Sequence, residues 1–260
     1  MRGVFMKKRG NVKSITIACM VFAILTCCGM TDARAVGEVD NALYARLLAA
    51  HVTDGVVDYA GLKGDEKTLA AYLSVLNRVD TARLGETELF AFYINAYNAC
   101  TLAFVLTGYP GITSIKELGT LFRNPWKKRV CPVGGTLRTL DEIEHEILRP
   151  RFRDPRIHFA VNCASKGCPP LRSSPYTGEN LDAELDEVTS AFINDPERNR
   201  LTGRDLYVSR IFSWYAEDFD DDIVGFFLRY ARGDLKERLE RLKDDVTIHY
   251  LSYDWLLNGK

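Results

Sequence analysis

The sequence lacks an excess of charge of either sign, because 34 Lys and Arg residues stand against 35 Asp and Glu residues and the formal net charge is -1. A protein that follows nucleic-acid phosphates carries a basic surplus, so we expect no nucleic-acid partner. The sequence also lacks a glycine-rich phosphate loop after a predicted strand, and we expect no cofactor. Repeats and low-complexity tracts are absent as well. With 47% hydrophobic residues among 260, the chain predicts a globular domain with a substantial core.

The apolar run near the N-terminus is too short to span a membrane comfortably. Ile15–Cys28 has fourteen residues, whereas a spanning helix needs about 20. The basic residues that precede it are Lys7, Lys8, Arg9 and Lys13. The small-x-small pattern Ala33-Arg34-Ala35 follows, as in a secretory signal peptide. We therefore predict a signal peptide over residues 1–35 and a single exported globular domain over residues 36–260.

This N-terminus predicts a periplasmic or secreted protein with no stable membrane span after signal cleavage. An uncleaved anchor and a lipid on Cys28 are the alternatives, and the cysteine directly before Cys28 disfavours the lipoprotein. Removal of the signal region leaves four cysteines, namely Cys100, Cys131, Cys163 and Cys168. An even number in an oxidising compartment permits up to two disulfides.

A long apolar segment, Thr87–Leu106, predicts the central buried helix, because apolar residues occupy nearly its whole circumference. Asn95 and Asn98 interrupt it one turn apart on a shared face. Buried amides need partners, since an unpaired one costs about 1–3 kcal/mol. Two interpretations stay open: the amides bond to neighbouring backbone, or they line a binding pocket.

Short strands are predicted between the helices. Residues 129–140 suggest a hairpin with Gly134-Gly135 at its turn, and Thr139 begins a capping box with Glu142. Residues 156–162 alternate as a strand, with His158 and Asn162 on one face. The fold class that follows is α+β, a mainly helical single domain with a small, mostly antiparallel sheet packed on a central buried helix.

The stretch HFAVNCASKGCPPL, residues 158–171, holds the candidate chemistry. In a thiol hydrolase or acyl transferase, His158 would be the base and Cys168 or Cys163 the nucleophile, with Cys168 favoured by its loop. In a non-catalytic module, a Cys163–Cys168 disulfide would rigidify the loop by about 2 kcal/mol. A metal site lacks a fourth ligand at suitable spacing, so we expect none.

Three further kinds of residue receive structural interpretations. Glu144 is expected to pair with Arg156 or Arg210, and Asp218 to cap a helix that begins at Phe219. The tryptophans, Trp126, Trp214 and Trp255, are core or rim residues that would make a ligand wall if they gathered near His158.

Five blocks occur in order along the chain: FYINAYNACTL, IEHEILR, DPRIHFAVNCASKGCPPLR, SRIFSWYAEDF and YDWLLN. Together, over about residues 57–255, they resemble the bacterial and plant family known as domain of unknown function 547. The resemblance implies the fold and no agreed activity. A weaker, distant likeness links the chain to the papain and transglutaminase-like group, in which the nucleophile opens the central helix. Here Cys100 lies in the middle of that helix.

We therefore predict a site that gathers the Asn95 and Asn98 face of the helix, the His158 and Asn162 face of the strand and the loop 163–171. The working interpretation is a thiol hydrolase or acyl transferase that acts on a peptide or envelope component. The alternative is a binding or structural module, held by the Cys163–Cys168 bridge, with an unknown small-molecule or peptide ligand.

Overall fold

The computed structural model describes residues 1, 3, 37–120, 123–243 and 245–259. The chain divides into two units, Met1–Ala33 and Arg34–Lys260, and the fold described here belongs to the second. The predicted signal peptide, with its cleavage site and Cys28, lies outside the described residues except for positions 1 and 3.

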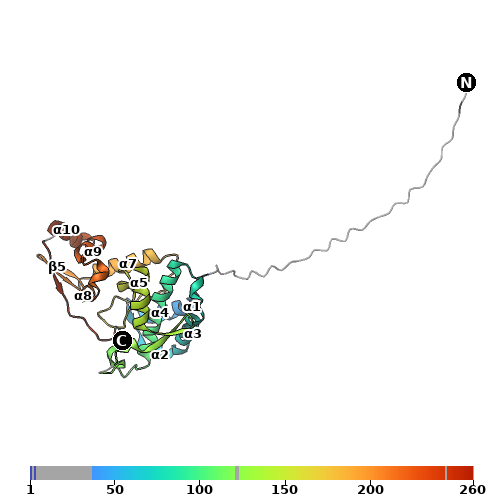
Figure 1. Ribbon diagram of the computed structural model, residues 1–260, viewed down its shortest axis with the longest axis horizontal. Coiled ribbons are helices and arrows are strands. Elements are labelled where there is room, and N and C mark those ends of the chain that lie inside the picture. The colour runs from blue at the N-terminus through green and yellow to red at the C-terminus, as the bar shows by residue number, and fades with distance from the viewer. Residues whose placement is uncertain (2, 4–36, 121–122, 244, 260) are drawn as a thin grey trace. The chain divides into compact units, whose positions relative to one another are not determined.

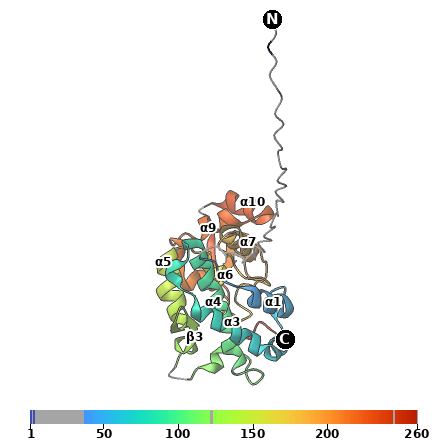
Figure 2. The ribbon, with the colours of Figure 1, turned by 90° about the vertical axis from the view of Figure 1, so that its right-hand side faces the viewer.

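Helix α4, Glu86–Leu106, is the centre of the helical body and confirms the predicted central helix. It lies between α5 on one side and α1 and α3 on the other (Figures 1 and 2). Its length and mean hydropathy of 1.5 would suit a membrane span, but 94% of its most apolar window is buried inside the domain. Since it is apolar all round, it packs on every side.

The helices and short helical turns around α4 come mostly from the first half of the chain. They are α1 Ala42–His51, α2 Tyr59–Gly64, α3 Glu66–Arg78, η1 Thr81–Arg83, η2 Ile115–Leu118 and η3 Pro125–Lys127. Two very short strands, β1 Val52–Thr53 and β2 Val56–Val57, pair antiparallel between α1 and α2.

The predicted hairpin is confirmed as β3, Arg129–Val133, and β4, Thr136–Thr139, which pair antiparallel. Gly134 and Gly135 both have positive φ, 56° and 75°, as the tight hairpin turn requires. The hairpin packs on α4, and Cys131 of β3 pairs with Cys100 of α4 at a Cα–Cα distance of 5.3 Å. A covalent link of this kind fixes the hairpin to the central helix.

The capping box at Thr139 is also confirmed. The Glu142 N–H donates to Thr139 Oγ1 at 2.9 Å, and the Thr139 N–H donates to Glu142 Oε2 at 2.9 Å. The helix that follows is not regular: η4, Glu142–Leu148, is a π-helical segment that continues into α5, Arg149–Phe152. Segments with π-helical hydrogen bonding are rare in proteins. Those that occur are often found at functional sites, because they change which side chains share a face.

The predicted strand over residues 156–162 is wrong. Its middle is a helical turn, α6, Ile157–Ala160, started by Asp154, whose Oδ1 accepts from the Arg156 N–H at 2.9 Å. All four α6 residues are buried, with His158 only 3% exposed. Alternation between apolar and polar residues is typical of a strand with one solvent-exposed face. The α6 residues have no such face, because all four are buried.

The last third of the chain forms a second apolar cluster with a three-stranded sheet. Its helical elements are α7 Leu181–Ile193, α8 Ile211–Trp214, η5 Ala216–Phe219, α9 Ile223–Tyr230 and α10 Gly233–Leu242. Its strands are β5 Arg200–Thr202, β6 Asp205–Val208 and β7 Thr247–Tyr250. β5 pairs with β6 antiparallel, and β6 pairs with β7 parallel.

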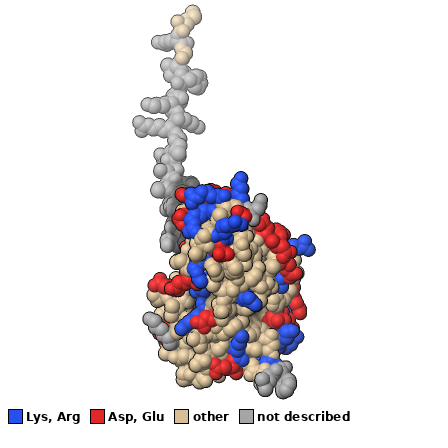
Figure 3. All heavy atoms as spheres, turned by 90° about the vertical axis from the view of Figure 1, so that its left-hand side faces the viewer, with Lys and Arg blue, Asp and Glu red and all other residues tan. Residues whose placement is uncertain are grey.

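The α+β class, mainly helical with small and mostly antiparallel sheets, is confirmed. The strands form separate small sheets rather than one, and the β3–β4 hairpin is the sheet that packs on α4. Both signs of charge are present on the face drawn in Figure 3, with uncharged surface between them.

Candidate functional site

A cavity of about 310 Å³ brings together six parts of the chain. They are α4, the segment around η3, the η4 segment, the α6 turn with its following loop, and the segments around residues 214 and 254. The side chains that line it are those of Tyr97, Asn124, Trp126, Asp141, Glu144, His145, His158, Val161, Cys163, Cys168, Pro169, Ile211, Trp214, Tyr215, Tyr253 and Trp255. It therefore contains three of the residues predicted as catalytic, His158, Cys163 and Cys168.

His158 is held by a carboxylate from a turn sixty residues later in the chain. His158 Nε2 lies 2.6 Å from Asp218 Oδ2. The imidazole stacks on the Tyr215 ring, with centroids 3.9 Å apart. The other ring nitrogen, Nδ1, has no hydrogen-bond partner among the residues that the structure describes. His158 is a lining residue of the cavity, with 1% of its side chain exposed, and Nδ1 is its polar atom that Asp218 does not occupy.

Asp218 is itself fixed by Arg149. Arg149 Nε donates to Asp218 Oδ2 at 2.6 Å, and Arg149 Nη2 donates to Oδ1 at 2.9 Å. Burial raises the pKa of the Asp218 carboxyl, but hydrogen bonds from His158 and Arg149 outweigh burial and hold the pKa well below its usual range. The carboxylate is therefore ionised and accepts, which places the proton of neutral His158 on Nε2 and the lone pair on Nδ1.

The expectation that Asp218 caps a helix at Phe219 is wrong. Asp218 lies inside the turn η5, and the helix that follows, α9, begins at Ile223 with Asp222 as its cap. Asp222 Oδ1 accepts from the Gly225 N–H at 2.8 Å. The WYAEDF block thus supplies an orienting carboxylate rather than a helix cap.

Glu144 forms the opposite, acidic part of the cavity. It is 6% exposed, and its Oε1 accepts from the Tyr215 hydroxyl at 2.7 Å. Burial and the nearby Glu144 carboxylate raise the pKa of Tyr97 and of Tyr215 well above the usual range, so both hydroxyls stay protonated. The expected pairing of Glu144 with Arg156 is wrong, because Arg156 binds the carboxylates of Asp154, Asp182 and Asp186.

Aromatic rings form much of the remaining wall. Trp214, Tyr253 and Trp255 pack together with centroid distances of 4.6–5.7 Å, and Trp126 meets Trp255 edge-on at 5.7 Å. All three tryptophans of the chain therefore line the cavity that also holds His158. The sequence predicts a ligand wall if the tryptophans gather near His158, and they do gather there.

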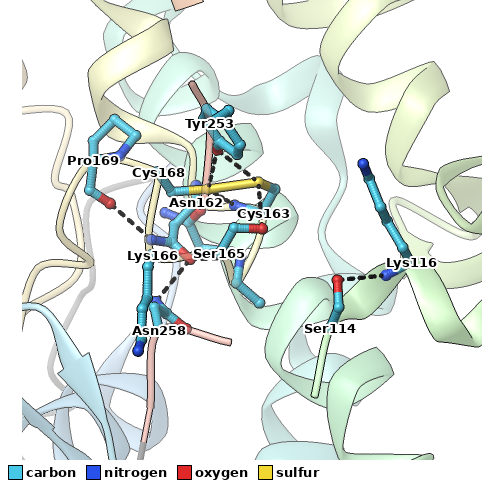
Figure 4. Close-up of a disulfide and its surroundings, with 12 residues drawn as sticks. Ser114, Lys116, Asn162, Cys163, Ser165, Lys166, Cys168, Pro169, Tyr253 and Asn258 are labelled. Atoms are coloured by element: carbon cyan, nitrogen blue, oxygen red, sulfur yellow. Dashed lines mark hydrogen bonds between the residues drawn. A yellow bond between two sulfur atoms is a disulfide. The ribbon is translucent and has the colours of Figure 1, made fainter. Parts of the chain in front are cut away.

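Cys163 and Cys168 are paired at disulfide distance, with their Cα atoms 6.3 Å apart (Figure 4). The Tyr253 hydroxyl lies beside the pair, 3.3 Å from Cys163 Sγ and 3.1 Å from Cys168 Sγ. Cys168 is 3% exposed, whereas Cys163 is only partly buried. Cys163 is thus the more accessible sulfur. The argument that favoured Cys168 assumed a strand before it, and that strand is absent from the described residues 156–162.

The three asparagines predicted as binding residues lie behind the cavity wall. Asn98 donates to the Ala160 carbonyl at 2.9 Å and accepts from the Asn162 N–H at 2.8 Å. Asn95 makes the same two-bond contact with the backbone of Tyr176, at 2.8 and 2.9 Å. None of the three is among the described residues that line this cavity. Asn98 and Asn162 fix the segments that carry His158 and the sulfurs, whereas Asn95 fixes the segment at Tyr176.

Asn162 ties the cysteine loop to the end of the chain. Its Nδ2 donates to the Pro169 carbonyl at 2.7 Å, and its Oδ1 accepts from the Ala164 N–H at 2.8 Å (Figure 4). Asn258 Nδ2 donates to the same Oδ1 at 3.2 Å. The loop between the cysteines therefore has one imposed shape, whether or not the sulfurs are joined.

Sequence patterns did not identify three residues that lie outside the sequence block of His158 but belong to its surroundings in the fold. Asp218 contacts His158, Arg149 contacts Asp218, and Tyr253 contacts the sulfurs, yet each lies in a different sequence block. The only available signal was the position of these blocks in the family pattern. No group of three or more His, Cys, Asp or Glu side chains suited to a metal ion occurs among the described residues.

Comparison with known proteins adds the family and no activity. No curated protein and no solved structure matches the chain, so the likeness to the papain and transglutaminase-like group gains no support. A family model matches residues 81–193, from the turn before α4 to the end of α7. That segment, which holds α4, His158 and both site cysteines, matches the family described as Protein of unknown function, DUF547.

Proposed function

We propose that the cavity is the active site of a hydrolase or acyl transferase that acts on a peptide or envelope component. His158 is the general base, Asp218 orients it, and Cys163 in its reduced form is the nucleophile. One observation carries the proposal: His158 Nε2 lies 2.6 Å from Asp218 Oδ2 at the wall of a cavity that also contains both sulfurs. A nucleophile, a base and a group that orients the base are the parts that covalent acyl transfer needs.

The proposed reaction begins with the Cys163–Cys168 pair reduced by an external thiol. Nδ1 of His158 takes the Cys163 proton, and the thiolate forms a bond to the acyl carbon. The imidazolium then returns the proton to the leaving amine or alcohol as its bond to carbon breaks. Nδ1 then deprotonates water, or an acceptor amine or alcohol, which attacks the thioester carbon. The C–S bond breaks, the acyl group leaves as acid or as the new amide or ester, and the imidazolium returns the proton to the Cys163 thiolate. Asp218 stabilises the imidazolium throughout, and the Tyr253 hydroxyl, 3.3 Å from Cys163 Sγ, is the proposed donor to the developing oxyanion.

The alternative proposal is a binding module in which the Cys163–Cys168 bridge stays closed. Supporting it is the pairing of the two sulfurs at disulfide distance, with a second such pair at Cys100–Cys131. Disulfides persist in oxidising compartments, and the N-terminal sequence pattern favours export. We propose the periplasm or the extracellular space as the site of action. N-terminal sequencing of the protein from those fractions tests this, with Val36 as the expected first residue.

The rate at which the sulfurs react separates the two proposals. The purified domain is reduced, the reductant is removed, and alkylation by iodoacetamide is followed at each cysteine by mass spectrometry. In the enzyme, Cys163 at pH 7 reacts at least about tenfold faster in the wild type than in His158→Asn, because thiolate is the reacting form. His249→Asn is the matched control, since His249 also pairs with a carboxylate, Asp205 at 2.8 Å, but outside the cavity.

Equal alkylation rates in wild type and His158→Asn would reject activation of the thiol by His158. A pair that resists mild reduction and leaves no alkylatable thiol at positions 163 and 168 would favour the binding module. A second readout is the acyl-enzyme: brief incubation of the reduced protein with p-nitrophenyl acetate is expected to add one acetyl group to Cys163.

A further inference from the structure

The charge of the cavity wall is one-sided. Two carboxylates, Asp141 and Glu144, line it, and no Lys or Arg is among the lining residues that the structure describes. Two histidines, His145 and His158, are the only side chains there that can become positive. A ligand with a negative charge would meet carboxylates without a basic partner, so the cavity selects against acids.

Glu144 is the unusual member of this wall. It is buried, at 6% exposure, and its hydrogen-bond partners are neutral hydroxyls, those of Tyr215 and Tyr97. Buried carboxylates are normally paired with a cation, because desolvation of an unpaired charge is costly. No Lys or Arg in the described part of the chain forms an ion pair with Glu144. A positively charged ligand in the cavity would supply the missing partner.

The rings around the cavity suit the same kind of ligand. Six aromatic side chains line it: Tyr97, Trp126, Trp214, Tyr215, Tyr253 and Trp255. The face of an aromatic ring attracts an ammonium group, most strongly for tryptophan. The chain already uses one of these rings in this way, because Lys116 Nζ lies 3.6 Å from the centroid of Trp255. A wall of rings with carboxylates behind it is the chemistry that recognises an organic cation.

We propose that this cavity binds an organic cation, held between the aromatic rings with its positive charge directed to Glu144 and Asp141. The ligand is a small molecule or the end of a peptide or envelope component that carries an ammonium group. The cation site deepens the proposed function, on which it rests for its role, because it names the substrate class of the same cavity. Its volume of about 310 Å³ is at the lower end of small-molecule pockets and admits a small ligand or the end of a larger one rather than a folded partner.

Tryptophan fluorescence is a direct readout, since all three tryptophans of the chain line the cavity. The oxidised protein is titrated with choline and, in parallel, with its uncharged isostere 3,3-dimethyl-1-butanol. Choline is expected to change the fluorescence saturably, and the isostere to bind at least about tenfold more weakly. Equal affinity for the two probes, or no saturable response to choline, would overturn the cation site.

Substitution of the buried carboxylate tests the charge itself. Glu144→Gln keeps an oxygen that accepts from Tyr215 and removes the charge, so choline is expected to bind about tenfold more weakly while the isostere is unaffected. Glu146→Gln is the control, because it makes the same change at an exposed position two residues along η4 that does not line the cavity. Choline affinity in Glu144→Gln equal to that in the wild type would contradict the assignment.

Two further measurements keep the test decisive. If circular dichroism shows that Glu144→Gln does not fold, Asp141→Asn carries the same expectation, since Asp141 lines the cavity at a partly buried position. Titration with n-butylammonium and with a lysine-ended peptide compares free and attached amines, and preference for either over the isostere supports the site.

Choline binding is measured with the sulfurs oxidised, so failure of the alkylation test would reject the thiol reaction without removing the cation site.

Discussion

At the scale of single residues, the contact between His158 and Asp218 holds the imidazole at the cavity wall. Asp218 accepts hydrogen bonds from His158 and Arg149 and is about a quarter exposed, at 23% of its side chain. His158 could be identified from the sequence because it lies beside two cysteines in one block. Asp218 could not, because nothing local distinguishes a carboxylate that orients a distant histidine from one that caps a helix.

Asp218→Asn is expected to lower the free energy of unfolding at pH 7 by about 1–3 kcal/mol, because two charge-assisted hydrogen bonds lose their acceptor. The effect depends on pH. The pKa of Asp218 is 3.8 in its ordinary state and well below that in the folded protein. The contribution is therefore complete above about pH 5, where both states are ionised, and is lost as the pH falls and the unfolded state takes up its proton first.

Urea unfolding of wild type and Asp218→Asn at several pH values between 7 and about 2 measures this difference, which should shrink toward acid. Asp205→Asn is the control, because Asp205 also pairs with a histidine, His249, but both side chains are nearly half exposed. That change should cost less than about 1 kcal/mol. A wild-type to Asp218→Asn difference that stays constant down to acid pH would contradict the role given to the carboxylate.

At the scale of elements, α4 positions the site through two amides that make equivalent contacts with different segments. Asn98 holds Ala160 and Asn162, next to His158 and Cys163, whereas Asn95 holds Tyr176, which does not line the cavity. The sequence located both amides on one helical face. Their backbone partners, more than sixty residues away, depend on how the loops return to α4 and could not be deduced from spacing.

Asn98→Ala is expected to destabilise the protein by about 2–4 kcal/mol, since a buried carbonyl and a buried N–H lose their partners. It should also weaken choline binding and slow alkylation of Cys163, because the segment from His158 to Cys163 loses its attachment. Asn95→Ala should cost similar stability and leave both site measurements unchanged. Equal effects of the two substitutions on choline binding would contradict a specific role for Asn98 in the site.

The two cysteine pairs differ in the length of chain that each closes. Cys100 and Cys131 are separated by 31 positions and Cys163 and Cys168 by 5. In the chain-entropy account, removal of the first link by Cys100→Ala with Cys131→Ala costs about 4 kcal/mol, and removal of the second by Cys163→Ala with Cys168→Ala about 2 kcal/mol. Chemical denaturation without reductant measures both. A larger loss for the second double variant would show that the short loop does more than close a small ring.

The elements that sequence patterns located are those whose signals are local. α4 follows from its uninterrupted apolar surface, the hairpin from Gly134-Gly135, and the start of η4 from the Thr139 capping box. α6 was misassigned because both of its sides are buried, which removes the contrast that distinguishes a strand from a helix. The π-helical turns of η4 were not foreseen, because capping residues and apolar periodicity do not distinguish a π-helical segment from an α-helix.

At the scale of the whole domain, the cavity lies where two apolar clusters meet. The first is built around α4 and the second around Phe212, Phe219 and Phe226, while α6 contributes Ile157 to the first and Phe159 to the second. Residues 251–259 return from the second cluster to the first. On the way they pair with the cysteine loop, through Gly167 N to Asp254 O at 2.9 Å and Lys166 N to Leu256 O at 2.8 Å.

This returning segment also supplies Tyr253 and Trp255 to the cavity and ends beside the first cluster, where the Val57 N–H donates to the Asn258 carbonyl at 3.0 Å. A chain that stops at Ser252 is therefore expected to lose choline binding and to unfold over a broader range of urea, because the two clusters are less strongly coupled. Leu256→Ala is the control, as its side chain is 49% exposed and its backbone contacts remain. If the shortened chain unfolded in one transition with the midpoint and slope of the wild type, the last residues would contribute lining to the cavity but no coupling between the clusters.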